Sequence, residues 1–316
     1  MKKIGVDLGG TITAAAVFDE QYRLLARSSV PTRRSPTPQG IADSIAQACL
    51  ESCLACGMAP EDAAYIGIGS PGIVDPQQGI IEYWSRYDFT GVPMADLVKA
   101  RLGRPVYMEN DANAAALGEY VAGAGAGSRD MVAVTLGTGI GGGAVIGGRL
   151  YSGFNHAALE LGHMSIAYDG RPCTCGRRGC FEAYASVTAL IEQTRDAMRA
   201  APESYMWKLA PVPEKAGGRT AFDAMRAGDG AGREVVEAYT AFLACGLINI
   251  VNIFQPEVLC IGGGISNEGE TLLAPVRAAL DREEYARGLR QRTKLVRAQL
   301  GNDAGLYGAA ALPEYR

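Results

Sequence analysis

The first part of the chain alternates apolar and polar positions in a way that predicts strands joined by tight turns. Short apolar runs occupy Lys3–Leu8, Ile12–Phe18 and Arg23–Val30, and a glycine pair separates the first two. The spacing of apolar residues then changes to the helical period over residues 36–57, with Gly57 as the stop. The pattern predicts a β-meander opened by a glycine turn and followed by one helix.

Two further strands are predicted before the middle of the chain. Tyr65–Ile68 ends at the Gly-Ser-Pro-Gly segment 69–72, and Pro105–Met108 ends at polar residues 109–111. An alanine-rich helix, Ala112–Val121, follows, and Asp111 is expected to cap it.

A second set of strands repeats the plan of the first. Met131–Leu136 is followed by a glycine-rich turn over 137–143 and by a return strand, Ala144–Ile146, which indicates an internal duplication. The later chain is mainly helical: Ala231–Phe254 is the longest predicted helix, and Val258–Ile261 is a strand that ends in three glycines. We expect residues 123–127 to link two lobes and residues 200–218 to be an irregular insertion.

Length and charge narrow the class of protein. A chain of 316 residues exceeds the size at which one core stops growing, so two lobes are expected. The formal net charge is −4 and no long run of Lys and Arg occurs, which disfavours a nucleic-acid partner. The apolar segment after Met1 is too short for a signal peptide or a membrane span. We therefore expect a cytoplasmic protein with no membrane partner.

The first glycine turn is a candidate phosphate site. Asp7 stands at the end of a strand, and Gly9, Gly10 and Thr11 follow where the backbone can approach a ligand closely. A phosphate with its Mg²⁺ fits this arrangement. A plain hairpin turn with a surface aspartate is the alternative.

The second glycine turn contains Thr138 and Gly139 within a G-x-G-x-x-G match. A dinucleotide-binding turn should open a helix, whereas another apolar strand follows here, so the Rossmann interpretation fails. No G-x-x-x-x-G-K-[ST] segment is present, which also excludes a P-loop. The amide-rich turn remains a candidate for part of a triphosphate, and Gly263 and Gly264 for a nucleoside.

Polar residues gather where the strand before residue 109 meets the following helix. Asn110 is a candidate for holding a substrate hydroxyl, and Asp111 for removing its proton as a general base. Simple helix capping is the alternative.

A histidine and three cysteines form the most specific constellation of the chain. His163, Cys173, Cys175 and Cys180 make a soft four-ligand set suited to tetrahedral Zn²⁺. Because all four positions are filled by protein, the zinc is expected to be structural, and the second imidazole nitrogen can serve a ligand. Glu160 and Glu182, which flank this segment, are candidates for binding hydroxyls.

A second group of cysteines has the spacing C-x₃-C-x₂-C, which some iron–sulfur sites use. Cys49, Cys53 and Cys56 lie inside the predicted first helix, where they share one face and cysteine behaves as a small hydrophobe. We interpret them as core residues.

With these motifs in place, the chain resembles the ROK family of bacterial sugar kinases and sugar-responsive repressors. The resemblance spans nearly the whole chain and rests on segments 7–11, 69–72, 109–113, 136–139, 160–163 and 173–182. It implies the two-lobed actin-like ATPase fold, with ribonuclease-H-like lobes, and an ATP-dependent hexose kinase that is commonly a homodimer. We expect an α/β N-terminal lobe over 1–121, a larger lobe over 122–302 with a zinc loop at 163–180, and a C-terminal helix at about 303–316 packed on the first lobe.

The resemblance also implies a role for each motif residue. Asp111 resembles the catalytic base. The implied sugar ligands are Gly72, Asn110, Asp111, Glu160, His163 and Glu182. The implied ATP and Mg²⁺ ligands are Asp7, Gly9, Gly10, Thr11, Thr138, Gly139, Gly263 and Gly264.

The chain departs from the family pattern beside the sugar segment. Leu159 precedes Glu160 where a glycine is usual, and His156 stands at another position where glycine is common. Glucose is the expected substrate, and N-acylmannosamine or another hexose is the alternative. Family repressors carry a DNA-binding segment before the first glycine turn. Here Asp7 stands almost at the start of the sequence, which leaves no room for such a segment, so we expect an enzyme rather than a non-catalytic regulator.

Overall fold

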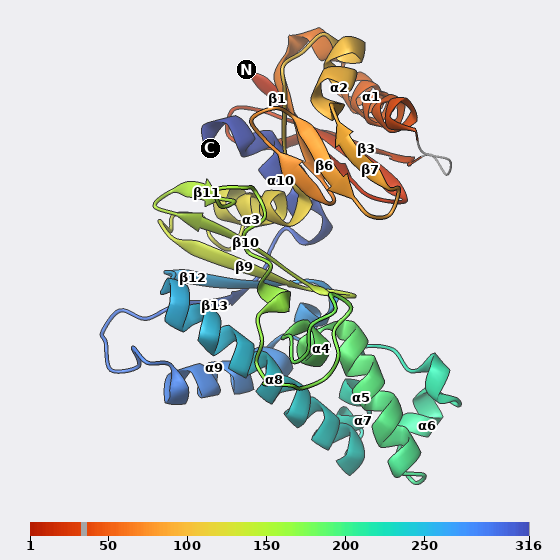
Figure 1. Cartoon of the computed structure of the whole chain (residues 1–316), viewed down its shortest axis with the longest axis vertical. Coiled ribbons are helices and arrows are strands. Elements are labelled where there is room, and N and C mark those ends of the chain that lie inside the picture. Colours follow the sequence, from red (N-terminus) through yellow and green to blue (C-terminus); the bar gives the residue numbers. More distant parts are fainter. Residues whose placement is uncertain (33–36, 316) are drawn as a thin grey trace. The chain divides into compact units, whose positions relative to one another are not determined.

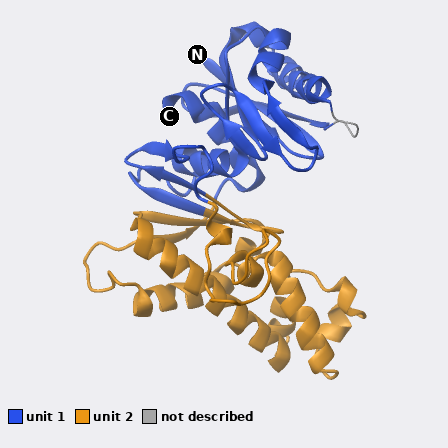
Figure 2. Cartoon of the chain, viewed as in Figure 1, with its two compact units in different colours: residues 1–133, 143–159, 299–316 blue, residues 134–142, 160–298 orange. Residues whose placement is uncertain are grey.

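A computed structural model of the chain describes residues 1–32 and 37–315. They divide into two compact units (Figure 2): unit 1 comprises residues 1–133, 143–159 and 299–316, and unit 2 comprises residues 134–142 and 160–298. The predicted lobe boundaries at residues 121 and 302 stay a prediction.

The first sheet, in unit 1, has five strands in the order β3-β2-β1-β4-β8 (Figure 1). The first three strands are antiparallel and the last two are parallel to β1. Their bounds are β1 Lys2–Leu8, β2 Ile12–Phe18, β3 Leu24–Pro31, β4 Ala63–Ser70 and β8 Val106–Asn110. All five predicted strands are confirmed, with every end within two residues. The largest differences are in β4 and β8, which extend two residues further, to Ser70 and Asn110.

The alternation of β2 explains how both faces of this sheet are covered. Ala15 and Val17 join the core beneath α1 (Pro38–Ala55), whereas Ala14, Ala16 and Phe18 pack on α10 (Ala304–Ala311). The N-terminus of α1 is capped by Thr37, whose hydroxyl accepts from the Gly40 amide at 3.1 Å. The predicted helix over 36–57 is confirmed; residue 36 lies outside the described residues.

Helix α10 approaches the sheet and α3 (Asp111–Ala122) closely because glycines stand at the contacts. A Cβ at Gly67 of β4 would lie 1.8 Å from the Ala309 carbonyl oxygen, and one at Gly308 would lie 1.7 Å from the Ala114 carbonyl oxygen. No side chain fits at either position, so backbone packs on backbone. These contacts tie the C-terminal helix to β4 and to α3.

Unit 1 also holds a small antiparallel sheet in the order β5-β6-β7. Its strands, with the neighbouring helix, are β5 Ile73–Asp75, β6 Ile80–Trp84, β7 Phe89–Val92 and α2 Met94–Leu102. The turn between β6 and β7 is held by the packed rings of Trp84, Tyr87 and Phe89. The sequence analysis did not predict this sheet.

The second five-stranded sheet has the order β11-β10-β9-β12-β13. Its bounds are β9 Met131–Leu136, β10 Ile140–Ile146, β11 Arg149–Tyr151, β12 Val258–Gly262 and β13 Lys294–Arg297. Counted in chain order, both sheets follow the same plan of third, second, first, fourth and fifth strand, which confirms the predicted duplication. The predicted turn over 137–143 is too long: β10 already begins at Ile140, because the glycines at 141–143 are strand residues.

The helices of unit 2 surround α8 (Gly230–Phe254), which packs against α5, α7 and α9. Their bounds are α4 Glu182–Ala185, α5 Val187–Ala200, α6 Met206–Leu209, α7 Thr220–Arg226 and α9 Glu270–Glu283. Within the described ranges α8 is the one helix long and apolar enough to cross a membrane, and 56% of its most apolar window is buried inside the fold. A core helix of a soluble protein has this composition, and the packing of α8 on three helices fits that role.

Candidate active site

Asn110 and Asp111 lie where β8 passes directly into α3. The side-chain oxygen of Asn110 accepts from the amides of Ala112 at 2.9 Å and Asn113 at 3.2 Å, so Asn110 is the helix cap. The prediction that Asp111 caps the helix is therefore wrong: Asp111 is the first helical residue. The strand runs two residues further than its apolar pattern indicates, to Asn110. Its polar residue Glu109 is nevertheless buried, and it accepts from the Asn113 side chain at 3.2 Å.

The side-chain nitrogen of Asn110 contacts the segment that follows β4. This nitrogen donates to the Gly72 carbonyl at 3.0 Å, which brings these two predicted sugar ligands together. Gly72 has a φ of +86°, and a Cβ there would lie 2.2 Å from the Tyr83 carbonyl oxygen. Both facts require glycine.

The carboxyl group of Asp111 is perturbed in the way expected of a catalytic base. Its pKa is raised to about 6: burial is the largest cause and the nearby Asp7 carboxylate adds to the increase, while the hydrogen bond from the Ala112 amide, at 2.8 Å, opposes it. At neutral pH most of Asp111 is then ionised yet basic enough to accept a proton. Clustered, perturbed carboxylates are typical of functional sites.

Asp7 is the second-last residue of β1 and neighbours the start of α10. Burial raises the pKa of its carboxyl group, Arg27 lowers it, and Asp303 raises it. Gly305 of α10 leaves room for the Asp7 carboxyl group, which would lie 3.2 Å from a Cβ there. Because burial disfavours the ionised form of Asp7, a cation bound beside it would stabilise that form.

The glycine turn after Asp7 is a hydrogen-bonded hairpin. The Gly9 amide donates to the Ile12 carbonyl at 3.0 Å, and the Thr32 amide donates to the Thr11 carbonyl at 2.9 Å. The Tyr87 hydroxyl donates to the Gly10 carbonyl at 2.5 Å. Tyr87 could not be predicted as a neighbour of Gly10, because nothing in the chain between residues 10 and 87 indicates that the two turns meet.

The second glycine turn, in unit 2, is braced by a residue predicted to bind sugar. One Glu182 oxygen accepts from the Ile140 amide at 2.8 Å and would lie 2.3 Å from a Cβ at Gly139. The Thr188 hydroxyl donates to the Thr138 carbonyl at 2.7 Å. Gly263, after β12, lies against the end of β9, where its Cβ would be 2.1 Å from the Leu136 carbonyl oxygen.

The four predicted zinc ligands come together in unit 2. Their ligand atoms lie within 4.8 Å of one another, with 3.6 Å between His163 Nδ1 and the Cys173 sulfur and 3.7 Å between the Cys175 and Cys180 sulfurs. A tetrahedron with zinc–sulfur bonds of about 2.3 Å has sulfur–sulfur edges of about 3.8 Å. The residues fit the ion, and Nδ1 faces the cluster, which leaves Nε2 of His163 for another partner.

The two residues that depart from the family pattern both have left-handed backbone. His156 has a φ of +60° and Leu159 a φ of +66°, in a conformation that glycine adopts without strain. Nε2 of His156 lies 3.9 Å from an Asp75 carboxylate oxygen, three residues past Gly72. The structure thus explains why glycine is usual at these positions.

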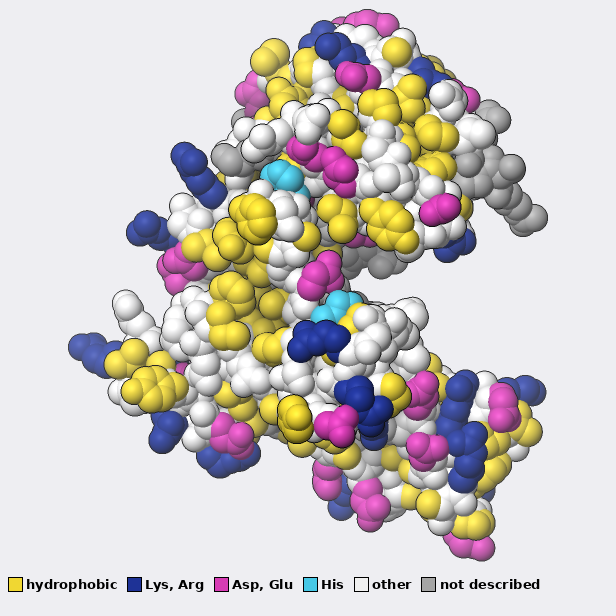
Figure 3. Space-filling view, in the orientation of Figure 1, with side chains coloured by type: hydrophobic (Ala, Val, Ile, Leu, Met, Phe, Trp, Pro, Cys, Tyr) yellow, Lys and Arg dark blue, Asp and Glu magenta, His cyan; other side chains and the backbone are white. Residues whose placement is uncertain are grey.

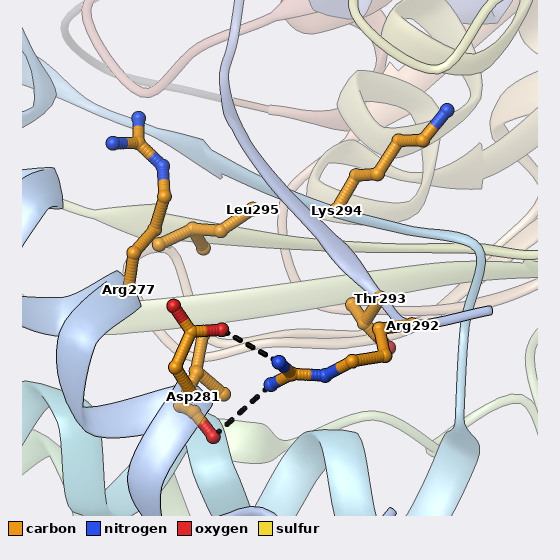
Figure 4. A pocket seen from close by; sticks show the side chains of 7 residues that line it. Arg277, Asp281, Arg292, Thr293, Lys294 and Leu295 are labelled. Carbon is orange, nitrogen blue, oxygen red and sulfur yellow. Dashed lines mark hydrogen bonds and ion pairs between the residues drawn. The ribbon is translucent and has the colours of Figure 1, made fainter. Parts of the chain in front are cut away.

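A cleft of about 280 Å³ lies apart from the predicted site residues, between α9 and β13 (Figure 4). Arg292 lines it and pairs with Asp281 at 2.8 Å and with Glu284 at 2.5 Å. The charge of Arg292 is therefore compensated by the two carboxylates. On the face displayed in Figure 3, acidic and basic side chains are interspersed, in keeping with the small net charge.

Comparison with known proteins agrees with the fold and the motifs. The duplicated sheets define the actin-like ATPase fold of sugar kinases, as predicted. The ROK family profile matches residues 3–315, and the chain belongs to this family. The glucokinase of Thermotoga maritima is 39% identical over 318 residues, which cover 100% of this chain and 98% of the relative.

Two solved structures extend this comparison. The ROK glucokinase of Streptomyces griseus, in complex with glucose and AMPPNP, is 38% identical with a TM-score of 0.80 and covers 99% of each chain. The ROK hexokinase of Thermus thermophilus is 35% identical with a TM-score of 0.81, and the match covers 99% of this chain and 97% of that one.

Proposed function

We propose that this protein is a glucokinase, which transfers the γ-phosphoryl group of ATP to the 6-hydroxyl of glucose and so forms glucose 6-phosphate. The observation that carries the proposal is Asp111, a buried carboxylate with a pKa of about 6 beside Asp7. The whole-chain similarity to glucokinases supplies the substrate and the nucleotide.

Asp111 acts as the general base in this proposal. It accepts the proton of the sugar hydroxyl as the new O–P bond forms, while the bond from the γ-phosphorus to the leaving ADP oxygen breaks. Asn110 orients the hydroxyl, because its own orientation is fixed by two α3 amides and the Gly72 carbonyl. Glu160, His163 and Glu182 bind the remaining hydroxyls.

The two glycine turns hold the nucleotide phosphates in this proposal. On the first turn Gly10 and Thr11 supply backbone amides and a hydroxyl, and Gly9, whose own amide donates to the Ile12 carbonyl, keeps the turn free of a side chain. Thr138 and Gly139 supply amides and a hydroxyl on the other turn. Gly263 and Gly264 adjoin the adenosine. Asp7 would hold Mg²⁺, which when bound neutralises phosphate charge.

The zinc proposal rests on the distances within the cysteine–histidine cluster. Zinc held by His163, Cys173, Cys175 and Cys180 would be structural, since the protein supplies four ligands. Its role is to fix the imidazole so that Nε2 of His163 points to a sugar hydroxyl.

Four further assignments remain proposals. A kinase of N-acylmannosamine or another hexose is the alternative, because His156 and Leu159 change the segment just before Glu160. The protein is expected to be cytoplasmic and to form a homodimer. A non-catalytic regulator is disfavoured by the presence of both Asn110 and Asp111.

Release of ADP from Mg-ATP against a panel of sugars tests the proposal. The panel contains glucose, mannose, allose, fructose, N-acetylglucosamine and N-acetylmannosamine. We expect the highest kcat/KM with glucose. A preference for N-acetylmannosamine would establish the alternative kinase, and no sugar-dependent release from folded, zinc-loaded protein would contradict the kinase proposal.

A further inference from the structure

Arg86, in the turn between β6 and β7, lies directly on the first glycine turn. Its Nε is 3.0 Å and its guanidinium carbon 3.2 Å from the position that a Cβ at Gly10 would take. The absence of a side chain at Gly10 therefore makes room for an arginine. Nothing in the motif 7–11 indicates this neighbour.

The turn that carries Arg86 is held in place on both sides. The Tyr87 hydroxyl donates to the Gly10 carbonyl, and the Tyr87 ring packs on Trp84 at 4.6 Å and on Phe89 at 5.7 Å between centroids. The guanidinium itself lies 5.6 Å from the Tyr87 ring centroid. The aromatic packing of the hairpin thus fixes the backbone that carries Arg86, and the Tyr87 ring contacts its guanidinium group.

The charge of Arg86 is not compensated by a neighbouring acid. Among the described residues no carboxylate lies within ion-pair distance of it, and the side chain is exposed. Asp7, the acid of the same turn, takes its attractive interaction from Arg27 instead. An exposed, positioned guanidinium over an amide-rich turn is suited to a phosphate oxygen, which it binds with two parallel hydrogen bonds.

We propose that Arg86 binds the γ-phosphate of ATP and stabilises the charge on the phosphoryl group during transfer. The inference rests on the proposed kinase function and deepens it. Phosphoryl transfer gains most from positioning and charge neutralisation, and an arginine at the transferred group supplies both. An arginine that holds the γ-phosphate distinguishes a nucleoside triphosphate from a diphosphate, which lacks that group.

Nucleotide binding by the full-length Arg86→Met protein tests the proposal without needing turnover. Methionine keeps an apolar stem over Gly10 and removes the charge. We expect the Kd for Mg-AMPPNP to rise about 10- to 100-fold, as for the loss of a hydrogen bond to a charged group. The Kd for Mg-ADP should change less than about threefold, since the diphosphate lacks the group that Arg86 binds.

Matched variants separate this role from a structural one. Arg282→Met, at an exposed arginine of α9, should leave both affinities unchanged. Arg86→Lys should recover part of the AMPPNP affinity, because lysine retains the charge without the two-pronged geometry. In turnover assays kcat of Arg86→Met should fall about 10- to 100-fold with little change in the glucose KM.

Two outcomes would overturn the inference. Unchanged AMPPNP affinity in Arg86→Met would show that the guanidinium does not reach the γ-phosphate. An equal loss for AMPPNP and ADP would show that the variant disturbs the glycine turn as a whole. If the unmodified protein binds AMPPNP but phosphorylates no sugar, the proposed function fails while the binding comparison still decides the role of Arg86.

Discussion

Asp111 is the residue on which the proposed reaction depends, and the fold makes its carboxyl group unfavourable to ionise. The folded-state pKa of Asp111 is raised from 3.8 to about 6, mainly by burial and in part by the Asp7 carboxylate. Between those two pH values the folded protein binds more protons at this position than the unfolded chain does. Stability therefore falls as the pH rises through this window, so the proposed base acts at a cost to the fold.

Asp111→Asn should consequently stabilise the protein while it removes activity. We expect a gain of up to about 3 kcal/mol in the free energy of unfolding at pH 7.5 and a smaller gain at pH 5, since a shift of about two pKa units corresponds to that energy. Urea unfolding at the two pH values measures the difference. The exposed Asp88→Asn serves as the control, and equal gains at both pH values would contradict the account.

The same carboxylate predicts the acid limb of the pH profile. Asp111 must be ionised to accept a proton, so kcat/KM for the sugar should fall below about pH 6 by about tenfold per pH unit. A profile that stays flat down to pH 5 would exclude Asp111 as the base.

At the scale of elements, backbone-to-backbone packing fixes α10 against α3 and β4. Gly308→Ala would place a methyl group 1.7 Å from the Ala114 carbonyl oxygen. Because backbone cannot yield as a side-chain tip can, we expect a loss of about 1–3 kcal/mol in thermal or urea unfolding. Gly217→Ala, where nothing lies within 4 Å, is the matched control and should change stability by less than about 0.5 kcal/mol.

The zinc loop is the second element with a direct test. Cys175→Ser removes one of four ligands, so we expect loss of the bound metal and a higher KM for sugar, because His163 is no longer fixed. Elemental analysis should find about one zinc per chain in the unmodified protein and much less in the variant. Cys245→Ser, at an exposed cysteine outside the cluster, should retain the metal. Equal metal content in both variants would contradict the site.

At the scale of the whole molecule, local patterns were sufficient to predict most of the fold. Alternating apolar positions and glycine turns located the five strands of the first sheet and β9, β10 and β12 of the second, and the repeated strand-turn-strand plan predicted the duplication. The short strands β11 and β13 were not predicted. The small sheet β5-β6-β7 was missed because its strands are short and only partly buried. Two groups of residues that the family motifs predicted do lie together in the structure. Asn110 contacts Gly72 because they follow neighbouring strands, and the four zinc ligands meet because they are close in the chain.

Contacts between distant segments could not be predicted in the same way. Glu119 is buried and accepts from the amides of Gln299 and Leu300, 180 and 181 residues away, which fastens the segment leading into α10. Arg86 and Gly10 meet only because a hairpin folds over the first turn. One sequence without aligned relatives carries no signal for such pairs.

The role of Asp111 as the general base of glucose phosphorylation is tested by comparing the unmodified protein with Asp111→Asn, using glucose and Mg-ATP. The account predicts glucose-dependent ADP release by the unmodified protein, a kcat lower by roughly 10²–10⁴ in the variant, and a glucose Kd that changes little, because the base acts on the transferred proton and not on sugar affinity. Full turnover by Asp111→Asn, or no glucose-dependent release by the unmodified protein, would contradict it.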